Sequence, residues 1–268
     1  MRVYLALLFA AALLLAACGN DTSQQDSDNA ETATQPTLSR DSMRILYGQF
    51  LAERTDSMKT YQPKGEGHLY PVDEAPIDTA FYVFREQLRR AIERKEVFAL
   101  LDATAKDISV SAGEQSGFAD FVSTWGLDSK QPDTLQIWKV LGDILAGGGT
   151  FSNGRQAFDA PYVCATWPEK YDAVDYGAII GAGVRLRAQP NLNSRIMKTI
   201  SYDIVLVLDE SEEAEIDGER YPWVQVETLD GVQGYVWGKF IGYPVGYRAG
   251  FRRGEGDSWR MVYLVAGD

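Results

Sequence analysis

The stretch GVRLRAQPNLNSRIMKTI spans residues 183–200 and shows most clearly the pattern from which the fold is predicted. Aliphatic residues alternate with arginine over Val184–Arg187, so one face of a short strand is apolar and the other is charged. Pro190 cannot donate a backbone hydrogen bond, and the Gln-Pro-Asn sequence around it indicates a turn. A second apolar run begins at Ile196. The stretch therefore predicts two strands of a small barrel, and it leaves open whether their surface also binds a ligand.

Short alternating segments continue on both sides of this stretch, over residues 176–243. Glycine-rich and Asp-Gly turns separate them, a composition typical of a small barrel. The acidic run at residues 209–219 is interpreted as a solvated hairpin loop. Alternate positions should face the barrel interior, which predicts an interior of Val184, Leu186, Ile196, Ile200, Val205, Val207, Val224, Val226 and Val236.

Several of these segments occur in the order of a known family. Residues 184–187, the turn at residues 189–191, Ser194, and residues 223–226 and 231–237 together resemble the bacterial SH3-like domain. Tyr235 stands where tryptophan is more common in that family. The resemblance covers residues 176–243, about a quarter of the chain. It implies a small β-barrel and says little about the ligand.

Aromatic residues on the barrel strands are the main functional clue, because barrels that resemble this one bind peptides in an aromatic-lined groove. The arginines of the first strand are expected on its wet face, where they can meet a carboxylate of a peptidoglycan stem peptide. Two other interpretations stay open: Trp223 and Tyr235 pack in the barrel, and Asn191 only bonds to its own turn. The candidate groove residues are Arg187, Asn191, Trp223, Tyr235, Trp237 and Tyr243.

The N-terminus reads as a targeting segment. Residues 1–17 have a positive end and an apolar run too short to span a membrane, and the run ends in Leu-Ala-Ala before Cys18. This resembles a bacterial lipobox, which implies a lipoprotein signal peptide and lipid attachment at Cys18. Residues 18–42 are polar and are expected to form a disordered tether. By the same resemblance Gly19 favours the outer membrane, with the protein facing the periplasm.

The rest of the chain predicts an α+β fold. Residues 43–175 should form an N-terminal domain with helices at 43–58, from Asp78 as N-cap through 92, and at 97–101, 118–125 and 134–145. Strands are predicted at 107–113 and 160–167. Residues 244–268 predict a final hairpin that packs on the N-terminal domain. This part faintly resembles the α+β cone of nuclear-transport-factor-2-like proteins.

The net charge of the chain and its few histidine and cysteine residues limit the classes of function to be expected. A net charge of -12 would repel phosphate backbones, so nucleic acid is not expected as a partner. His68 is the single histidine, and Cys164 is the one cysteine besides Cys18. Their contexts favour structural roles over a Cys-His pair, so no catalytic set, metal site or cofactor is predicted.

The sequence thus predicts a non-enzymatic, lipid-anchored envelope protein whose barrel binds peptidoglycan stem peptides or an envelope protein. One alternative is a cell-wall hydrolase that uses the barrel for targeting. Another is an envelope protein whose N-terminal domain holds a small apolar ligand.

Overall fold

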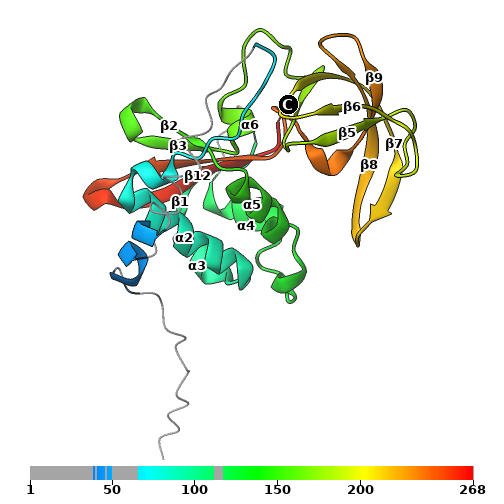
Figure 1. The fold of residues 1–268 in the computed structure, drawn as a ribbon. Helices are drawn as coiled ribbons and strands as arrows, with labels where there is room; N and C mark the ends of the chain where they lie inside the picture. The colour runs from blue at the N-terminus through cyan, green and yellow to red at the C-terminus, as the bar shows by residue number, and fades with distance from the viewer. Residues whose placement is uncertain (1–38, 40, 46, 50–65, 112–116, 268) are drawn as a thin grey trace, which may run out of the picture. The chain divides into compact units, whose positions relative to one another are not determined.

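Two β-sheets organise the protein, as a computed structural model of residues 39, 41–45, 47–49, 66–111 and 117–267 shows (Figure 1). The first sheet has five strands in the order β1, β12, β11, β3, β2. These are Thr104–Ser109, Trp259–Val265, Arg248–Arg253, Ala157–Ala160 and Thr150–Ser152. The β1–β12 pair is parallel and the other pairs are antiparallel. The C-terminal hairpin β11–β12 therefore lies inside the sheet of the N-terminal domain.

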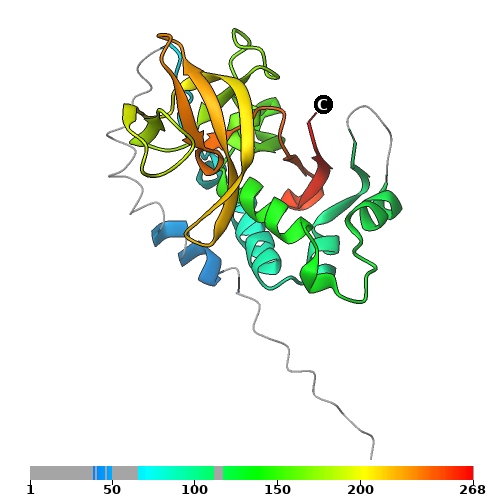
Figure 2. The same ribbon diagram turned by 90° about the vertical axis from the view of Figure 1, so that its right-hand side faces the viewer.

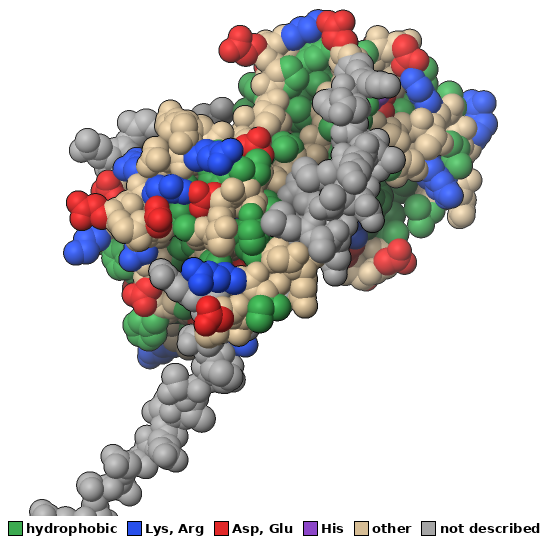
Figure 3. Space-filling model, turned by 60° about the vertical axis from the view of Figure 1, so that its left-hand side comes forward, with side chains coloured by type: hydrophobic (Ala, Val, Ile, Leu, Met, Phe, Trp, Pro, Cys, Tyr) green, Lys and Arg blue, Asp and Glu red, His purple; other side chains and the backbone are tan. Residues whose placement is uncertain are grey.

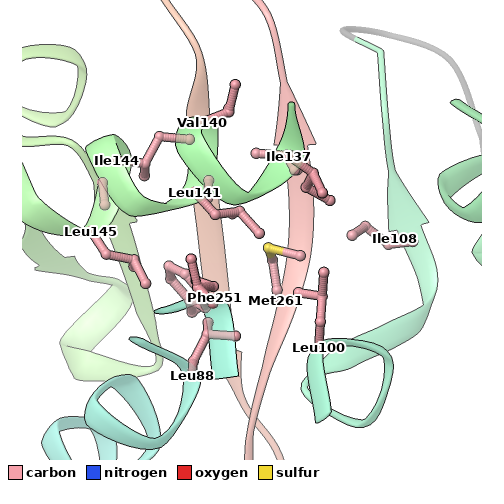
Figure 4. Close-up of a cluster of buried hydrophobic side chains, with 14 of the residues drawn as sticks. Leu88, Leu100, Ile108, Ile137, Val140, Leu141, Ile144, Leu145, Phe251 and Met261 are labelled. Atoms are coloured by element: carbon pink, nitrogen blue, oxygen red, sulfur yellow. The ribbon is translucent and has the colours of Figure 1, made fainter. Parts of the chain in front are cut away.

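Helices gather on one side of this sheet in Figure 1. They are α2 (Thr79–Glu93), α3 (Val97–Asp102), α4 (Phe118–Trp125) and α5 (Ile137–Ala146). The apolar faces of α2 and α5 bury side chains against the sheet, because residues at three- and four-residue steps share one helix face. Figure 4 shows part of the resulting core, with Leu88, Leu100, Ile108, Ile137, Val140, Leu141, Ile144, Leu145, Phe251 and Met261.

The first turn of α2 anchors this core. Asp78 caps the helix by accepting a hydrogen bond from the backbone N–H of Phe81 at 2.9 Å, as its residue type predicts. The ring of Phe81 is fully buried and lies 4.2 Å from that of Phe158 and 4.7 Å from that of Trp259, centroid to centroid. Arg253 of β11 also forms an ion pair with Asp78. The helix start is thus tied to the C-terminal hairpin.

The second sheet has seven strands that curl into a barrel, in the order β10, β4, β7, β8, β9, β5, β6. Their bounds are Ile241–Gly242, Tyr176–Ile179, Ile204–Ile216, Glu219–Thr228, Gln233–Trp237, Val184–Arg187 and Ile196–Ile200. The long β7–β8 hairpin extends beyond the shorter strands (Figure 2). The barrel core contains Ile179, Val184, Leu186, Ile200, Val205, Val224, Val226, Val236 and Ile241. The predicted α+β fold class, with a helical N-terminal part and a C-terminal barrel, is confirmed.

Two predicted elements are wrong. Residues 160–167 were expected as a strand, but β3 ends at Ala160 and Tyr162–Ala165 forms the short helix α6. Pro161 stops the strand ladder because it has no N–H, and its carbonyl accepts hydrogen bonds from the N–H groups of Cys164 and Ala165. Residues 209–219 were expected as a loop, but β7 continues to Ile216 because its acidic residues pair across the hairpin with β8.

Ile196 is also placed differently from its prediction. It was expected inside the barrel and is 45% exposed. The strand register shifts between Leu186 and Arg187, so that Leu186 pairs with Lys198 while Arg187 pairs with Ile196. A bulge of this kind changes which side chains face inward, and it turns Ile196 toward solvent.

Residues Leu38–Asp268 form one unit, and several contacts join the N-terminal domain to the barrel within it. The backbone N–H of Leu69 donates to the carbonyl of Tyr202, and the N–H of Ile204 donates to the carbonyl of Gly67. Leu69 and Ile204 also share a small apolar cluster with Val163 of α6. The segment before α2 therefore pairs with the start of β7.

Part of the predicted N-terminal organisation lies outside the described residues. This holds for the signal peptide, for Cys18, for most of the tether and for most of the helix expected at residues 43–58. Of that expected helix, residues 43–45 and 47–49 are described and are helical. None of the helices in the described ranges is both long and apolar enough to cross a membrane.

Candidate functional site

A groove of about 390 Å³ lies on the barrel surface. Strand β5, the loop after it, the tip of the β7–β8 hairpin, and strands β8 and β9 with the turn that follows all contribute to its wall. Its apolar lining includes Trp223, Trp237, Leu192, Ile216 and Phe240. The charged lining residues are Arg185, Arg187 and Asp217.

The two tryptophans form one wall of this groove. Trp223 and Trp237 are direct partners on β8 and β9, and their neighbours Val224 and Val236 point into the barrel core. Because side chains alternate along a strand, the tryptophans lie on the outer face. They are 4% and 7% exposed, and the indole N–H of Trp237 donates to the carbonyl of Tyr221 at 3.2 Å. They are therefore fixed surfaces that both pack on the barrel and line the groove.

Arg187 lies in the groove, but its side chain is buried. The prediction that it lies on the wet face of the strand is therefore wrong. Arg187 is only 7% exposed, and its Nη1 donates a hydrogen bond to the backbone carbonyl of Ser194 at 2.8 Å. The register shift at this point of β5 is the structural reason, because it turns the side chain toward the following loop. Arg185, two residues earlier, is exposed.

The loop after β5 is held by its own hydrogen bonds. The side chain of Asn191 accepts from the N–H of Asn193 at 3.1 Å, and the hydroxyl of Ser194 accepts from the N–H of Gln189 at 2.8 Å. Asn191 therefore has the turn-forming role that its residue type indicates, and it does not line the groove. The same loop presents Leu192, which is 53% exposed, at the groove edge.

The tip of the β7–β8 hairpin closes the groove on another side. Asp217 and Gly218 have φ angles of 53° and 81°, as a two-residue type I′ turn requires at both central positions. Ile216 and Asp217 line the groove from this tip. Their contribution was missed in the sequence, although the Asp-Gly dipeptide between two alternating segments is the signal that marks this hairpin.

Two other predicted groove residues lie elsewhere. Tyr235 is the cross-strand partner of Arg187 and is half-buried, but it is not part of the groove lining. The hydroxyl of Tyr243 donates to Glu210 at 2.7 Å, and burial together with this carboxylate raises the pKa of Tyr243. The structure thus brings together Arg187, Trp223 and Trp237, and it places Asn191, Tyr235 and Tyr243 outside the groove.

Tyr243 instead lines a larger cavity of about 910 Å³ between the N-terminal domain and the barrel. Much of its wall is apolar, from side chains such as Val140, Ile144 and Ile241. Its charged groups have partners: Asp73 pairs with Arg85, Asp143 with Lys139, and Glu219 with Lys239. These pairs leave the cavity with little net charge to select a ligand.

The residues considered for catalysis do not form a reactive pair. The Sγ of Cys164 contacts the backbone carbonyl of Tyr243 at 3.8 Å, and burial raises the pKa of this thiol to about 11. Such a thiol stays protonated at neutral pH, whereas a nucleophilic cysteine needs its thiolate. His68 lies instead against Asp203 at 3.7 Å and stacks on Tyr70. Within the described ranges no group of three or more His, Cys, Asp or Glu side chains is arranged to hold a metal ion.

Charged side chains elsewhere do not mark a competing site on the face drawn in Figure 3, where acidic and basic side chains are interspersed.

Comparison with known proteins identifies the family that the barrel resembles. Residues 182–242 match the family model of the bacterial SH3 domain. The match covers the strands that carry Arg187, Trp223 and Trp237. No curated protein and no solved structure matches the chain significantly.

Proposed function

We propose, from the premise that residues 182–242 are a bacterial SH3 domain, that this protein is a non-enzymatic binding protein of the bacterial cell envelope. Its barrel binds the stem peptides of peptidoglycan in the groove beside Trp223 and Trp237. The protein holds this barrel near the cell wall through a lipid on Cys18.

The observation that carries the proposal is the composition of the groove. Two immobile indole surfaces lie beside Leu192 and Phe240, which are 53% and 37% exposed. Apolar and aromatic surfaces of this kind bind extended peptides in SH3-type recognition, and a few polar groups fix the orientation. At about 390 Å³ the groove suits a short peptide with small side chains better than a long folded partner.

The other possible partner is an envelope protein, of which a short exposed segment would bind in the groove. A stem peptide is favoured because the groove combines small volume with two arginines, Arg185 and Arg187, and stem peptides carry carboxylates. A flat protein interface would need a larger apolar area than this groove provides.

The proposed location of the protein rests on the sequence of its N-terminus. A lipobox that ends at Cys18 and a polar tether through residue 42 would let the domains stand off a membrane. Gly19 favours the outer membrane over the inner membrane, so the groove would face the periplasm and the peptidoglycan.

The cell-wall hydrolase alternative finds little support in the geometry. The protonated Cys164 thiol and the separate surroundings of His68 give no activated nucleophile. Release of soluble fragments from sacculi by the purified protein would support the alternative.

The small-ligand alternative rests on the cavity of about 910 Å³ between the N-terminal domain and the barrel. Native mass spectrometry of the purified protein tests it. A co-purified small molecule would support this alternative, and a bare protein mass would count against it.

Co-sedimentation with purified peptidoglycan sacculi tests the main proposal. The chain would begin at Gly19, which removes the lipid and keeps the whole unit Leu38–Asp268. We expect the protein to pellet with sacculi at low and at moderate salt, because apolar contacts in the groove persist when charges are screened. Protein that stays in the supernatant at both salt concentrations would contradict the proposal.

A further inference from the structure

We infer that the groove recognises a free carboxylate at the end of a stem peptide, and that Arg187 is the residue that binds it. This inference rests on the proposed function and names the ligand feature that the same site selects. It distinguishes open stem peptides from stems whose terminal carboxylate has been converted to an amide by cross-linking.

The Arg187 side chain is buried in the groove wall and uses few of its hydrogen-bond donors within the protein. It is 7% exposed and lines the groove, and Ser194 accepts a hydrogen bond from its Nη1. None of its nitrogens is among the buried side-chain atoms that lack a partner. Ser194 takes the one side-chain hydrogen bond seen for Arg187 in the described chain, and the Nε and Nη2 of Arg187 are not among the fully buried atoms, so they keep some solvent exposure. A guanidinium has five N–H donors, so several stay available for a ligand.

The Arg187 guanidinium also lacks a counter-charge among the described residues. Among the described residues no carboxylate lies within 4.0 Å of the Arg187 guanidinium, in contrast to the other buried arginine, Arg85, which pairs with Asp73 at 2.7 Å. A cation that is largely removed from water and unpaired is unfavourable, and an anion bound beside it removes that cost. The site is therefore better matched to an anionic ligand than to an empty or neutral one.

The Arg187 guanidinium is also held in a fixed orientation. The Ser194 carbonyl fixes one end of the guanidinium, and the loop that carries Ser194 is itself held by hydrogen bonds. A guanidinium fixed in this way presents a planar fork that fits the two oxygens of a carboxylate. Little side-chain freedom then remains to be lost on binding.

The charges of the groove support the same ligand. Arg185 and Arg187 carry two positive charges and Asp217, at the hairpin tip, carries one negative charge. The local balance is positive although the chain as a whole has a net charge of -12. A carboxylate is thus attracted to this part of an otherwise acidic protein.

The apolar wall determines what lies next to the carboxylate. Trp223 and Trp237 line the same groove as Arg187, so a ligand that places its carboxylate on the arginine can lay a neighbouring methyl group against an indole. A terminal alanine has this combination of a free carboxylate and a small apolar side chain. Amide formation at that terminus removes the charge and with it the contact to Arg187.

The test compares one peptide in two forms. Diacetylated Lys-D-Ala-D-Ala would be prepared as the free acid and as the C-terminal amide, and each would be titrated into the isotope-labelled chain that begins at Gly19. Amide chemical shifts of the loop after β5 and of β9 would report binding. We expect the free acid to bind about tenfold more tightly or better, the effect of a charge-assisted pair of hydrogen bonds.

An Arg187→Gln variant provides the second arm, with Arg252→Gln, an exposed arginine outside the groove lining, as a control for general charge. Arg187→Gln should abolish the preference for the free acid, and Arg252→Gln should keep it. If Arg187→Gln does not fold, the acid and amide titrations of the unchanged protein still decide the inference.

Equal affinity for the acid and the amide would overturn the inference and leave the proposed function standing. The same conclusion would follow if neither peptide bound while the protein still pelleted with sacculi. If the protein bound neither the peptides nor the sacculi, the proposed function itself would fail.

Discussion

Trp223 of β8 and Trp237 of β9 are direct cross-strand partners on the outer face of the barrel, and both line the same groove. The residues next to them, Val224 and Val236, fill the barrel core. One short hairpin thus supplies the hydrophobic interior with one set of side chains and the binding surface with the other. This explains why the fold and the site are encoded in the same alternating segments.

The buried ion pair between Arg85 and Asp73 predicts a strong effect on stability. Its N–O distance is 2.7 Å, and the Arg85 side chain is almost entirely buried. Asp73→Ala should lower the free energy of unfolding by about 2 to 3 kcal/mol, because a buried cation loses its main partner. Urea unfolding followed by circular dichroism measures this change.

A second variant separates charge from packing at this pair. Asp73→Ala combined with Arg85→Met should lose less stability than Asp73→Ala alone, because no buried charge is left uncompensated. Arg220→Ala, at an exposed pair with Glu215, serves as the control and should change stability by less than about 1 kcal/mol. Equal losses in all three variants would contradict the assignment.

The C-terminal hairpin should be required for the N-terminal domain but not for the barrel. A chain that ends at Tyr243 lacks β11 and β12, which occupy two interior positions of the five-stranded sheet. It also loses Phe251 and Trp259 from the core. The nuclear magnetic resonance spectrum of this chain should keep dispersed barrel signals and lose those of the N-terminal domain. Cooperative unfolding of an intact N-terminal domain in the truncated chain would count against this account.

Cys164 predicts a specific dependence of stability on pH. Burial raises the pKa of its thiol from about 9 to about 11, so the unfolded chain releases this proton at lower pH than the folded chain. The contribution of the thiol is complete below about pH 9 and is lost as the pH rises toward about 11. The free energy of unfolding should therefore fall over this range, and it should fall less steeply in Cys164→Ala.

Chemical unfolding at several pH values, for both proteins from Gly19 onward, checks this prediction. Tyr243 and Tyr263, whose pKa values are also raised by burial, are present in both chains, and the Cys164 thiolate contributes to the raised pKa of Tyr263. Identical pH profiles for the two proteins would show that the thiol ionises alike in the folded and unfolded chains.

Much of the fold could be predicted because local pattern and tertiary packing agree. The helix at Phe118–Trp125 has the predicted bounds, and Asp78 caps α2 as its position before an apolar repeat indicates. The short apolar run at residues 160–167 could not be assigned correctly, because periodicity does not distinguish a strand from a helix over so few residues. Its helical form depends on Pro161 and on contacts outside the run.

The groove was predicted only in part, for a related reason. Trp223 and Trp237 lie on regular strands, where alternation shows which face they occupy. Leu192, Ile216 and Phe240 come from a loop, a hairpin tip and a turn, and only the three-dimensional path of the chain brings them together. The bulge that buries Arg187 is likewise invisible in the alternation of residues.

Sacculus binding by two matched pairs of variants tests the central claim most directly. Phe240→Ala and Leu192→Ala remove partly exposed apolar side chains from the groove, whereas Phe98→Ala and Leu229→Ala remove exposed side chains of the same types outside it. All four should fold like the unchanged protein, because each side chain is at least 37% exposed. The account predicts that the two groove variants bind sacculi roughly tenfold more weakly and that the two controls bind normally. Equal binding by all four variants would contradict the assignment of the groove.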